Sequence, residues 1–332
     1  MISRFRQFRA LAGLTALEAM RQPLFLLLTA SCVAATALAP LVLMHQFGEE
    51  GRLARDGGLA FHFVFGLFVA GYTACVSLSR EMRHGTAAAV LSKPVGRAMF
   101  FLAKFAGVAC VVIAFSFCAT LATLMAERVS ERFMLEPGFT GFVTDTRLGV
   151  MLAVSPLVAF LVAGFVNWRR GRPFESTAFG MLALFLMVAA VMACLFDRRG
   201  QWAPFDPLFQ FAIVPASLLI TLALLTLAAL ALALSTRLGV TPTLTLLSTL
   251  FLLGLMSDHW FGTRAAGNPL FGALYRLLPN WQHFWMSDAL SEGGSISVGY
   301  GVQAAIYGAL YVAGVLCLGG ASFYGADVES RG

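Results

Sequence analysis

Charged residues are scarce in this sequence. Asp, Glu, Lys and Arg make up 12% of its 332 residues, and hydrophobic residues make up 59%, whereas an ordinary soluble domain is about 25% charged. Such a composition exceeds what a soluble core can bury, so it predicts an all-α polytopic membrane helix bundle. The net charge of +6 is expected in the loops, as the positive-inside pattern requires, and not on a surface for nucleic acid.

Several chemical motifs are also missing. The sequence has no GxxxxGK[ST] phosphate loop, which excludes the usual way of holding ATP. No charged residue falls in the middle of a predicted span, where proton-driven carriers and pumps place such groups. We therefore expect no cofactor in this chain, and energy for transport would come from another subunit. No CxxC spacing occurs, so the cysteines are expected to be small core residues without metal or disulfide: Cys32, Cys75, Cys110, Cys118, Cys194 and Cys317.

Long apolar runs predict about eight membrane-spanning helices of roughly 20 residues each. The first run is longer than the roughly 7 to 15 residues of a signal-peptide core, so we expect a span there and no cleavage. Pro156 and Pro215 are expected to kink their helices without ending them. The predicted spans are residues 24–44, 59–79, 99–126, 148–166, 176–196, 208–234, 239–257 and 301–322.

The distribution of basic residues favours an N-in, C-in protein of the cytoplasmic (inner) membrane. With the N-terminus inside, 14 of the 23 lysines and arginines lie on the inner side and 9 on the outer side, whereas 5 of the 17 acidic residues lie inside. This asymmetry is the positive-inside bias. The inner basic residues are Arg4, Arg6, Arg9, Arg21, Arg80, Arg83, Lys93, Arg97, Lys104, Arg169, Arg170, Arg172, Arg237 and Arg331.

The N-terminal segment 1–22 is basic and amphipathic. One face of its helical wheel carries Phe5, Phe8, Ala12, Ala16 and Ala19, with the arginines largely elsewhere. We therefore expect an interfacial helix that leads into the first span.

A charged segment, residues 79–104, separates the second and third predicted spans. Gly85 permits a sharp bend, Thr86 can cap a helix through its hydroxyl, and Pro94 ends that helix. The pattern predicts a very short helix along the membrane surface.

One face of this short helix is apolar. Ala87, Val90 and Leu91 recur at i, i+3 and i+4 and therefore share a side. A helix of this length is not stable alone in water. We therefore expect its apolar face to dock on a partner.

The order of residues in the same segment resembles the signature between the second and third membrane helices of ABC transporter permeases of the type-2 exporter family. In that family the segment is the coupling helix, seated in a separate ATPase subunit. Ala103 is a departure, because many members have glycine there. The later stretches LSTRLGVTPTLTLLSTLFLLG and LPNWQHFWMSDAL resemble the second membrane half of the family. The matching positions are Glu81, Gly85, Thr86, Leu91, Ser92, Pro94, Val95, Arg97, Phe101 and Lys104.

The resemblance implies a function and its partners. The chain would be one permease domain, residues 1–332, that forms the path of an ATP-driven exporter and is not itself an enzyme. ATP and Mg would bind an ABC ATPase subunit, and a second permease copy or a paralogue would complete the path in the lipid bilayer. Family members commonly have six spans, so 148–196 is expected to be an inserted pair. Coupling within 80–98 is assigned to Glu81, Gly85, Thr86, Ala87, Val90, Leu91, Pro94 and Arg97.

Two outer segments have a pattern of their own. Residues 127–147 are expected to extend the third helix beyond the bilayer before turning back, with a solvated linker as the alternative. Residues 258–300 predict a helix over 270–278 and a second short helix. The resemblance implies that this outer helical hairpin closes the export path; a plain aromatic anchor at the membrane interface is the alternative. The candidate gate residues are Trp281, Phe284 and Trp285.

Two spans carry candidates for lining the path. Phenyl and hydroxyl side chains recur on them at helical spacing, although small and hydroxyl residues equally serve helix packing. These candidates are Phe61, Phe65, Phe68, Thr241, Thr245, Ser248 and Thr249.

Histidines give an alternative function. His45, His62, His259 and His283 are expected near the outer face. A membrane-integral redox, quinone-interacting or metal-handling subunit would use such residues. However, their spacing is not that of metal ligands, so interfacial histidines are the simpler interpretation.

Overall fold

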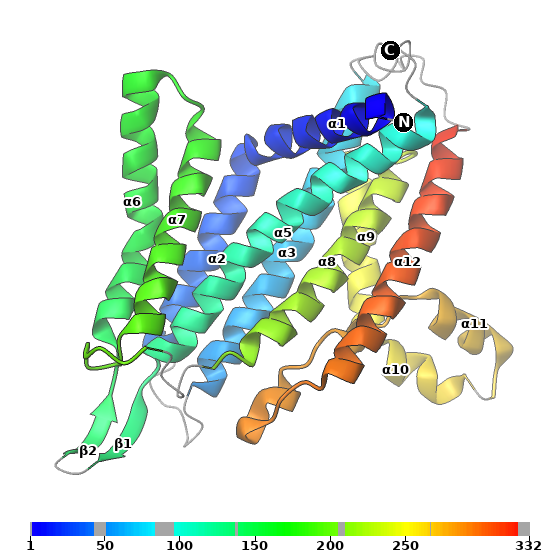
Figure 1. The fold of residues 1–332 in the computed structure, drawn as a ribbon. Helices are drawn as coiled ribbons and strands as arrows, with labels where there is room; N and C mark the ends of the chain where they lie inside the picture. The colour runs from blue at the N-terminus through cyan, green and yellow to red at the C-terminus, as the bar shows by residue number, and fades with distance from the viewer. Residues whose placement is uncertain are drawn as a thin grey trace.

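The computed structural model is a bundle of long inclined helices with one short β-hairpin (Figure 1). It describes residues 2–42, 51–83, 96–136, 139–204, 210–265 and 267–324. The all-α prediction is confirmed. The helices are α1 (Ile2–Met20), α2 (Pro23–Val42), α3 (Arg52–Arg83), α5 (Arg97–Val129), α6 (Thr146–Arg170), α7 (Phe174–Leu195), α8 (Ile213–Ser235), α9 (Val240–Leu255), α10 (Ser257–Trp260), α11 (Pro269–Leu277) and α12 (Val298–Tyr324).

The number of membrane spans agrees with the sequence. Among the described residues, seven helices are long and apolar enough to cross a bilayer, namely α2, α3, α5, α6, α7, α8 and α12. Helix α9 and the segment that follows it are bent by 65° and together can form an eighth span. The prediction of about eight spans is therefore confirmed, and both helices of the 148–196 pair are candidates.

Helix α3 occupies the centre of the bundle and packs against α5 and α8. Small residues allow this close approach. A methyl group at Gly58 would lie 2.7 Å from the Thr123 side chain of α5, and one at Gly66 would overlap Leu224 of α8. Because lipid is as apolar as these side chains, such close contact, and not water exclusion, holds membrane helices together.

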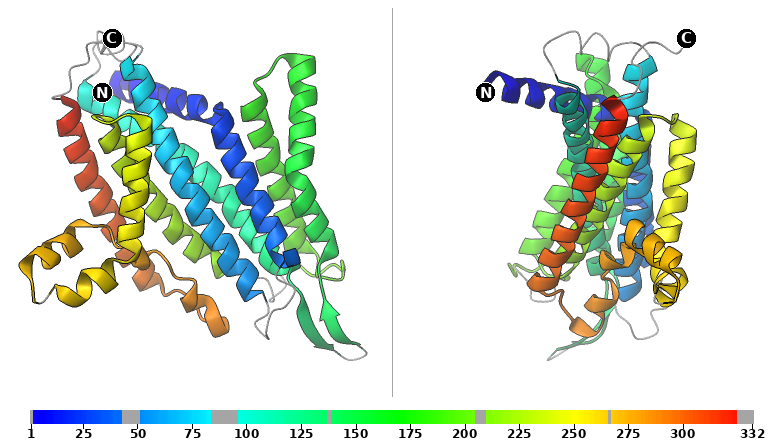
Figure 2. Two further views of the ribbon diagram at one scale, coloured as in Figure 1. Left: turned by 180° about the vertical axis from the view of Figure 1, so that it is seen from behind. Right: turned by 90° about the vertical axis from the view of Figure 1, so that its right-hand side faces the viewer.

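The remaining helices cover this centre from two sides. Helices α6 and α7 form a pair beside α2 and α5, while α9 and α12 lie on the opposite flank of the bundle (Figure 2). The outward face of α6 is strongly apolar and exposed at Leu157 and Leu161. Such a face suits contact with lipid.

Helix α1 lies across one end of the bundle and packs on α5 (Figures 1 and 2). Its approach depends on Gly107, because a methyl group there would lie 2.6 Å from the Ala12 carbonyl oxygen. Residues Ala12 and Ala16 of the predicted apolar face are half-buried and Ala19 is buried, but Phe5 is exposed. We call this end of the bundle, which also holds the end of α12, the α1 end.

The opposite end carries a β-hairpin that the sequence analysis missed. Strands β1 (Arg132–Glu136) and β2 (Phe139–Val143) are antiparallel, with Phe133 paired with Phe142. The expected extension of α5 is wrong beyond Val129, because aromatic residues favour strands on either side of the Pro-Gly turn signal. We call this end the β-hairpin end.

The prolines behave differently from one another. Pro156 lies inside α6 and does not end it, as predicted. Pro215 is only the third residue of α8, which begins at Ile213 and not at 208. The expected kink there is wrong, because a proline in the first turn removes no intrahelical hydrogen bond.

All six cysteines are free thiols. Cys32, Cys75 and Cys118 are buried, as the core prediction requires. Cys110 and Cys317 are exposed on the bundle surface, so the prediction is wrong for these two. The apolar sequence around them does not distinguish a core position from a lipid-facing one, since both are apolar.

The contact between Gly58 and Thr123 gives a test of the packing. Gly58→Ala should lower the free energy of unfolding by about 1–3 kcal/mol, because the methyl group overlaps a stiff β-branched side chain. Gly57→Ala is the matched control, since nothing lies within 4 Å of its new methyl group. Thermal unfolding of the detergent-purified protein measures both. Equal unfolding midpoints for the two variants would contradict the packing.

Candidate functional site

The predicted coupling residues are only partly placed. Gly85, Thr86, Ala87, Val90, Leu91 and Pro94 lie outside the described residues. Glu81 lies in the last turn of α3, and Arg97 is the first residue of α5. The segment therefore connects two adjacent helices at the α1 end of the bundle (Figure 1).

Arg97 ties the start of α5 to the end of α12. Its Nη1 donates to the Tyr324 carbonyl oxygen at 2.8 Å, and its guanidinium carbon lies 5.9 Å from the Tyr324 ring centroid. Two turns later Lys104 is buried, with Nζ 5.6 Å from the Phe100 ring centroid. The end of the predicted coupling segment is thus fixed to the last membrane helix.

The candidate path residues lie on two neighbouring helices. Thr241, Thr245 and Thr249 are exposed on the side of α9 opposite its buried face, and Thr245 and Thr249 donate to carbonyls one turn earlier at 3.1 and 2.9 Å. Ser248 is half-buried. Because these hydroxyl groups donate within their own helix, the stripe can face lipid or a second protein surface without unsatisfied donors.

The phenyl set lies on α3. Phe61 and Phe65 are half-buried and touch edge to face, with ring centroids 6.4 Å apart, and Phe68 is 43% exposed. Within the described residues no hydrogen bond or ring contact joins this set to the hydroxyl stripe of α9. The two sets therefore occupy open surface of adjacent helices without forming a closed path in one chain.

The candidate gate residues are packed into the bundle. Trp281 and Phe284 are fully buried, and Trp285 stacks on Phe63 at a centroid distance of 6.4 Å. Trp281 begins a 3₁₀ turn (Trp281–His283) and lies directly over Gly254 of α9. Full burial of Trp281 and Phe284 does not fit a plain anchor at the membrane interface, where one side of the ring is wet.

A polar network fixes this turn to the neighbouring helices. Asp258 Oδ1 accepts from the Tyr275 hydroxyl at 2.7 Å and from Asn280 Nδ2 at 2.8 Å. The Asn280 backbone N–H donates to the Tyr307 hydroxyl oxygen at 3.2 Å. The bond to Asp258 raises the pKa of Tyr275 above its usual value, so this stabilisation is present below pH of about 10 and is lost above it.

Helix α12 adds two further tyrosine contacts. The Tyr300 hydroxyl donates to the His283 carbonyl oxygen at 2.8 Å, and the Tyr311 hydroxyl donates to the Leu277 carbonyl oxygen at 2.9 Å. The connection between α9 and α12 is therefore held at several points over the first half of α12.

The β-hairpin end holds a group of buried charges that the sequence analysis missed. Arg128 of α5 pairs with Asp145 at 3.2 Å, and donates to the Ala193 carbonyl oxygen and to that of Phe196. Asp145 also caps α6 by accepting from the Leu148 N–H at 3.1 Å. A single side chain of α5 thus binds the start of α6 and the end of α7.

A second group of charges surrounds Glu127. Arg132 donates to Glu127 at 2.7 Å, and Arg198 donates to the Ser130 carbonyl oxygen at 2.7 Å. Burial and the charge of Arg132 lower the pKa of Arg198 to about 10. These residues belong to segments predicted as a helix extension or a loop. The one signal for pairing in the sequence is that charges of opposite sign lie close together there.

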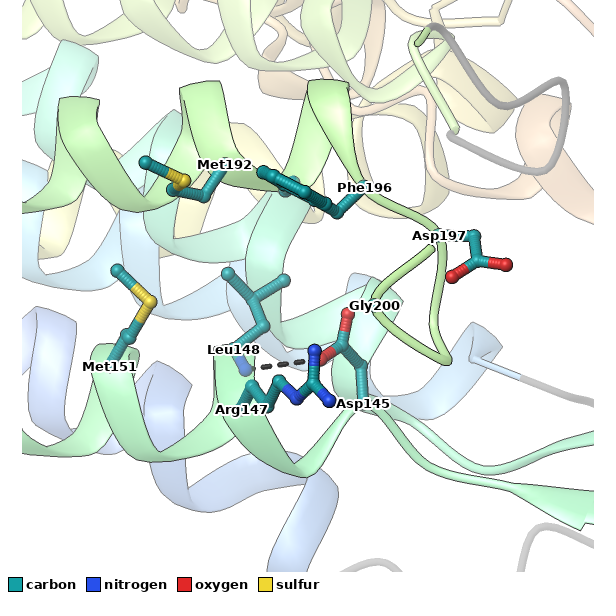
Figure 3. Close-up of a pocket in the computed structure, with 9 residues that line it drawn as sticks. Asp145, Arg147, Leu148, Met151, Met192, Phe196, Asp197 and Gly200 are labelled. Atoms are coloured by element: carbon teal, nitrogen blue, oxygen red, sulfur yellow. Dashed lines mark hydrogen bonds between the residues drawn. The ribbon is translucent and has the colours of Figure 1, made fainter. Parts of the chain in front are cut away.

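A cavity of about 220 Å³ lies between the ends of α6 and α7 at the β-hairpin end (Figure 3). Its wall includes Leu148, Met151, Met192 and Phe196, and Arg147 lies at its polar edge. No residue lining it belongs to the predicted path, gate or coupling sets. The sequence carries no motif that marks it, because its lining comes from two helices and a loop.

The candidate histidines differ in burial. His62 lies in α3, fully buried, with Nδ1 3.0 Å from Ser217 Oγ. Phe115 of α5 and Ser217 of α8 enclose it, and its place near the outer face stays a prediction. His259 and His283 are exposed, and His45 lies outside the described residues. Within the described ranges no three His, Cys, Asp or Glu side chains are placed to hold a metal ion.

Asp258 offers a test of the network beneath α11. Asp258→Ala should speed backbone hydrogen exchange in α11 by about tenfold or more, because two donors lose a charged acceptor. Asp288→Ala, which removes an exposed carboxylate from the same connection, is the control. Hydrogen–deuterium exchange with mass spectrometry measures both. Unchanged exchange in α11 of Asp258→Ala would refute the assigned role.

Comparison with known proteins matches the first half of the chain to a family model. The model described as ABC-2 family transporter protein matches residues 14–170, from within α1 to the end of α6. Among curated proteins and among solved structures, no match is found. The matched segment includes α3, α5 and the stretch between them that carries the resemblance, and the helices around it are apolar enough to span a membrane. The match supports an ABC-2 type permease whose helices are apolar enough to span a membrane.

Proposed function

We propose that this chain is the membrane-spanning subunit of an ATP-driven exporter. The observation that carries the proposal is the family match across α3, α5 and the segment between them. It is supported by the arrangement of the helix ends, because α3 ends and α5 begins at the α1 end (Figure 1). Residues 84–95 connect them there.

We assign the ATP hydrolysis that drives transport to a separate subunit. The sequence has no phosphate loop, so ATP and Mg are proposed to bind an ABC ATPase that seats the apolar face of Ala87, Val90 and Leu91. The α1 end is then cytoplasmic, which agrees with the excess of basic residues in the segments at this end. In this arrangement both chain termini are inside.

The transport path is proposed to form between two permease copies, or between this chain and a paralogue. The support is the open surface of α3 and α9, where Phe68 and the stripe of Thr241, Thr245 and Thr249 are exposed. The fixed connection between α9 and α12, with Trp281 and Phe284 buried beneath it, is proposed to close the path at the β-hairpin end.

Val90→Asp tests the coupling assignment. A carboxylate in an apolar groove is desolvated and unpaired, which costs several kcal/mol, so the variant should insert into the membrane normally but lose ATPase association and transport. Ala89→Asp is the matched control, because residue 89 lies on the opposite side of the predicted helix and faces water. Co-purification of the ATPase measures both. Normal ATPase association by Val90→Asp would show that this face does not dock.

Cysteine cross-linking tests the proposed pairing of permeases. In a background with the six native cysteines replaced, Phe68→Cys and Thr245→Cys should give a cross-linked dimer with a short thiol-reactive reagent in membranes. Leu161→Cys, on the exposed face of α6, should stay monomeric. Gel electrophoresis reads out the products. Cross-linking through α6 and not through α3 or α9 would move the interface to the other flank.

A further inference from the structure

The cavity between α6 and α7 has an apolar interior beside a polar edge. Leu148, Met151, Met192 and Phe196 form its wall, and Arg147 lies at the edge (Figure 3). At about 220 Å³ the cavity is smaller than a typical drug site, since such pockets measure about 300–1,000 Å³. It suits part of a chain-like apolar ligand better than a compact one.

The depth of this cavity corresponds to a bilayer boundary. Helix α6 has 25 residues and α7 has 22, which makes them about 37 and 33 Å long, whereas the hydrocarbon core is about 30 Å thick. Arg147 therefore lies at the level of the lipid headgroups. Met151 and Met192 lie roughly 5–8 Å deeper along their helices, within the acyl chains.

The apolar wall continues onto the surface that faces lipid. Met151 and Met192 are themselves partly exposed, at 38% and 42%, and their neighbours Val154 and Val191 are exposed as well. An acyl chain in the adjacent leaflet can therefore reach the cavity sideways, without leaving the hydrocarbon region. A polar ligand from water would lose its hydration against this wall.

Asp145 and Asp197 line the same cavity as Arg147 but do not pair with it. Among the described residues, no hydrogen bond or ion pair is made by the guanidinium of Arg147. The Asp145 carboxylate is occupied by Arg128 and the Leu148 N–H, and Asp197 Oδ1 accepts from two N–H groups of its own loop. Each of these two carboxylates therefore has hydrogen-bond donors other than Arg147.

The guanidinium of Arg147 lies against Gly200. Its guanidinium lies where a side chain at Gly200 would begin, and Gly200 has φ of +80°. Only glycine adopts this conformation readily and leaves this space. The loop after α7 therefore leaves room for the Arg147 guanidinium at the mouth of the cavity.

We propose that this cavity binds a phospholipid from the leaflet at the β-hairpin end, with one acyl chain between α6 and α7 and the phosphate on Arg147. Guanidinium binds phosphate through two parallel hydrogen bonds. The site lies on the flank of the bundle opposite α9 and α12. It is separate from the proposed transport path and does not depend on it.

The test measures the apparent Kd of the first bound lipid by native mass spectrometry of the delipidated protein. Palmitoyl-oleoyl-phosphatidylglycerol should bind, and the diacylglycerol with the same chains should bind about tenfold or more weakly, because it lacks the charge-assisted bonds. Inorganic phosphate should not raise the unfolding midpoint. Equal affinity for the diacylglycerol, or stabilisation by inorganic phosphate alone, overturns the proposal.

Matched variants locate the site. Met192→Trp fills the cavity and should raise the Kd of the first phosphatidylglycerol about tenfold or more, whereas Met187→Trp, equally exposed on the same helix, should leave it unchanged. Arg147→Gln should weaken binding, and Arg172→Gln at the other end of the pair should not. Unfolding midpoints without lipid control for misfolding. Equal Kd values for Met192→Trp and Met187→Trp overturn the proposal.

Discussion

The bundle depends on how closely α3 approaches α5 and α8. The hydrophobic effect does not drive these helices together, because lipid is as apolar as their side chains. Their association therefore rests on van der Waals contact and on hydrogen bonds between helices. Gly58 and Gly66 supply the contact. His62 and Ser217 supply a hydrogen bond at 3.0 Å in the same place. The flanking helices are arranged around this centre, and every proposed functional surface is placed by it.

Buried charge sets a second constraint at the β-hairpin end. Arg128 and Asp145 are nearly inaccessible to solvent, and a buried charge is tolerated only with a partner and with its remaining hydrogen bonds satisfied. Arg128 meets this condition by donating to the Ala193 carbonyl in the last turn of α7, where a helix leaves carbonyls without partners, and to the Phe196 carbonyl just beyond it. The Arg128 side chain therefore both neutralises Asp145 and caps the end of α7.

The sequence predicted the fold well where long apolar runs marked the helices. Apolar runs located the spans to within a few residues. The exception is α3, which begins at Arg52, because its first turns contain charged residues and a hydropathy pattern detects only the apolar part of a helix. The β-hairpin was missed, since a helix extension was expected from charge alone. Placement of the site was weaker: exposure on α3 and α9 depends on which faces other helices cover. The burial of His62 depends on neighbours distant in sequence.

The attachment of α6 and α7 determines how the pair affects the orientation of the helices that follow it. The two helices enter and leave the bundle at the same end, next to one another, and Arg128 binds both junctions. Because the pair crosses the membrane twice, its presence leaves the sidedness of α8 and all later segments unaltered. Removal of the whole pair would therefore keep the later helices in their orientation, whereas removal of one helix of the pair would invert every segment that follows it.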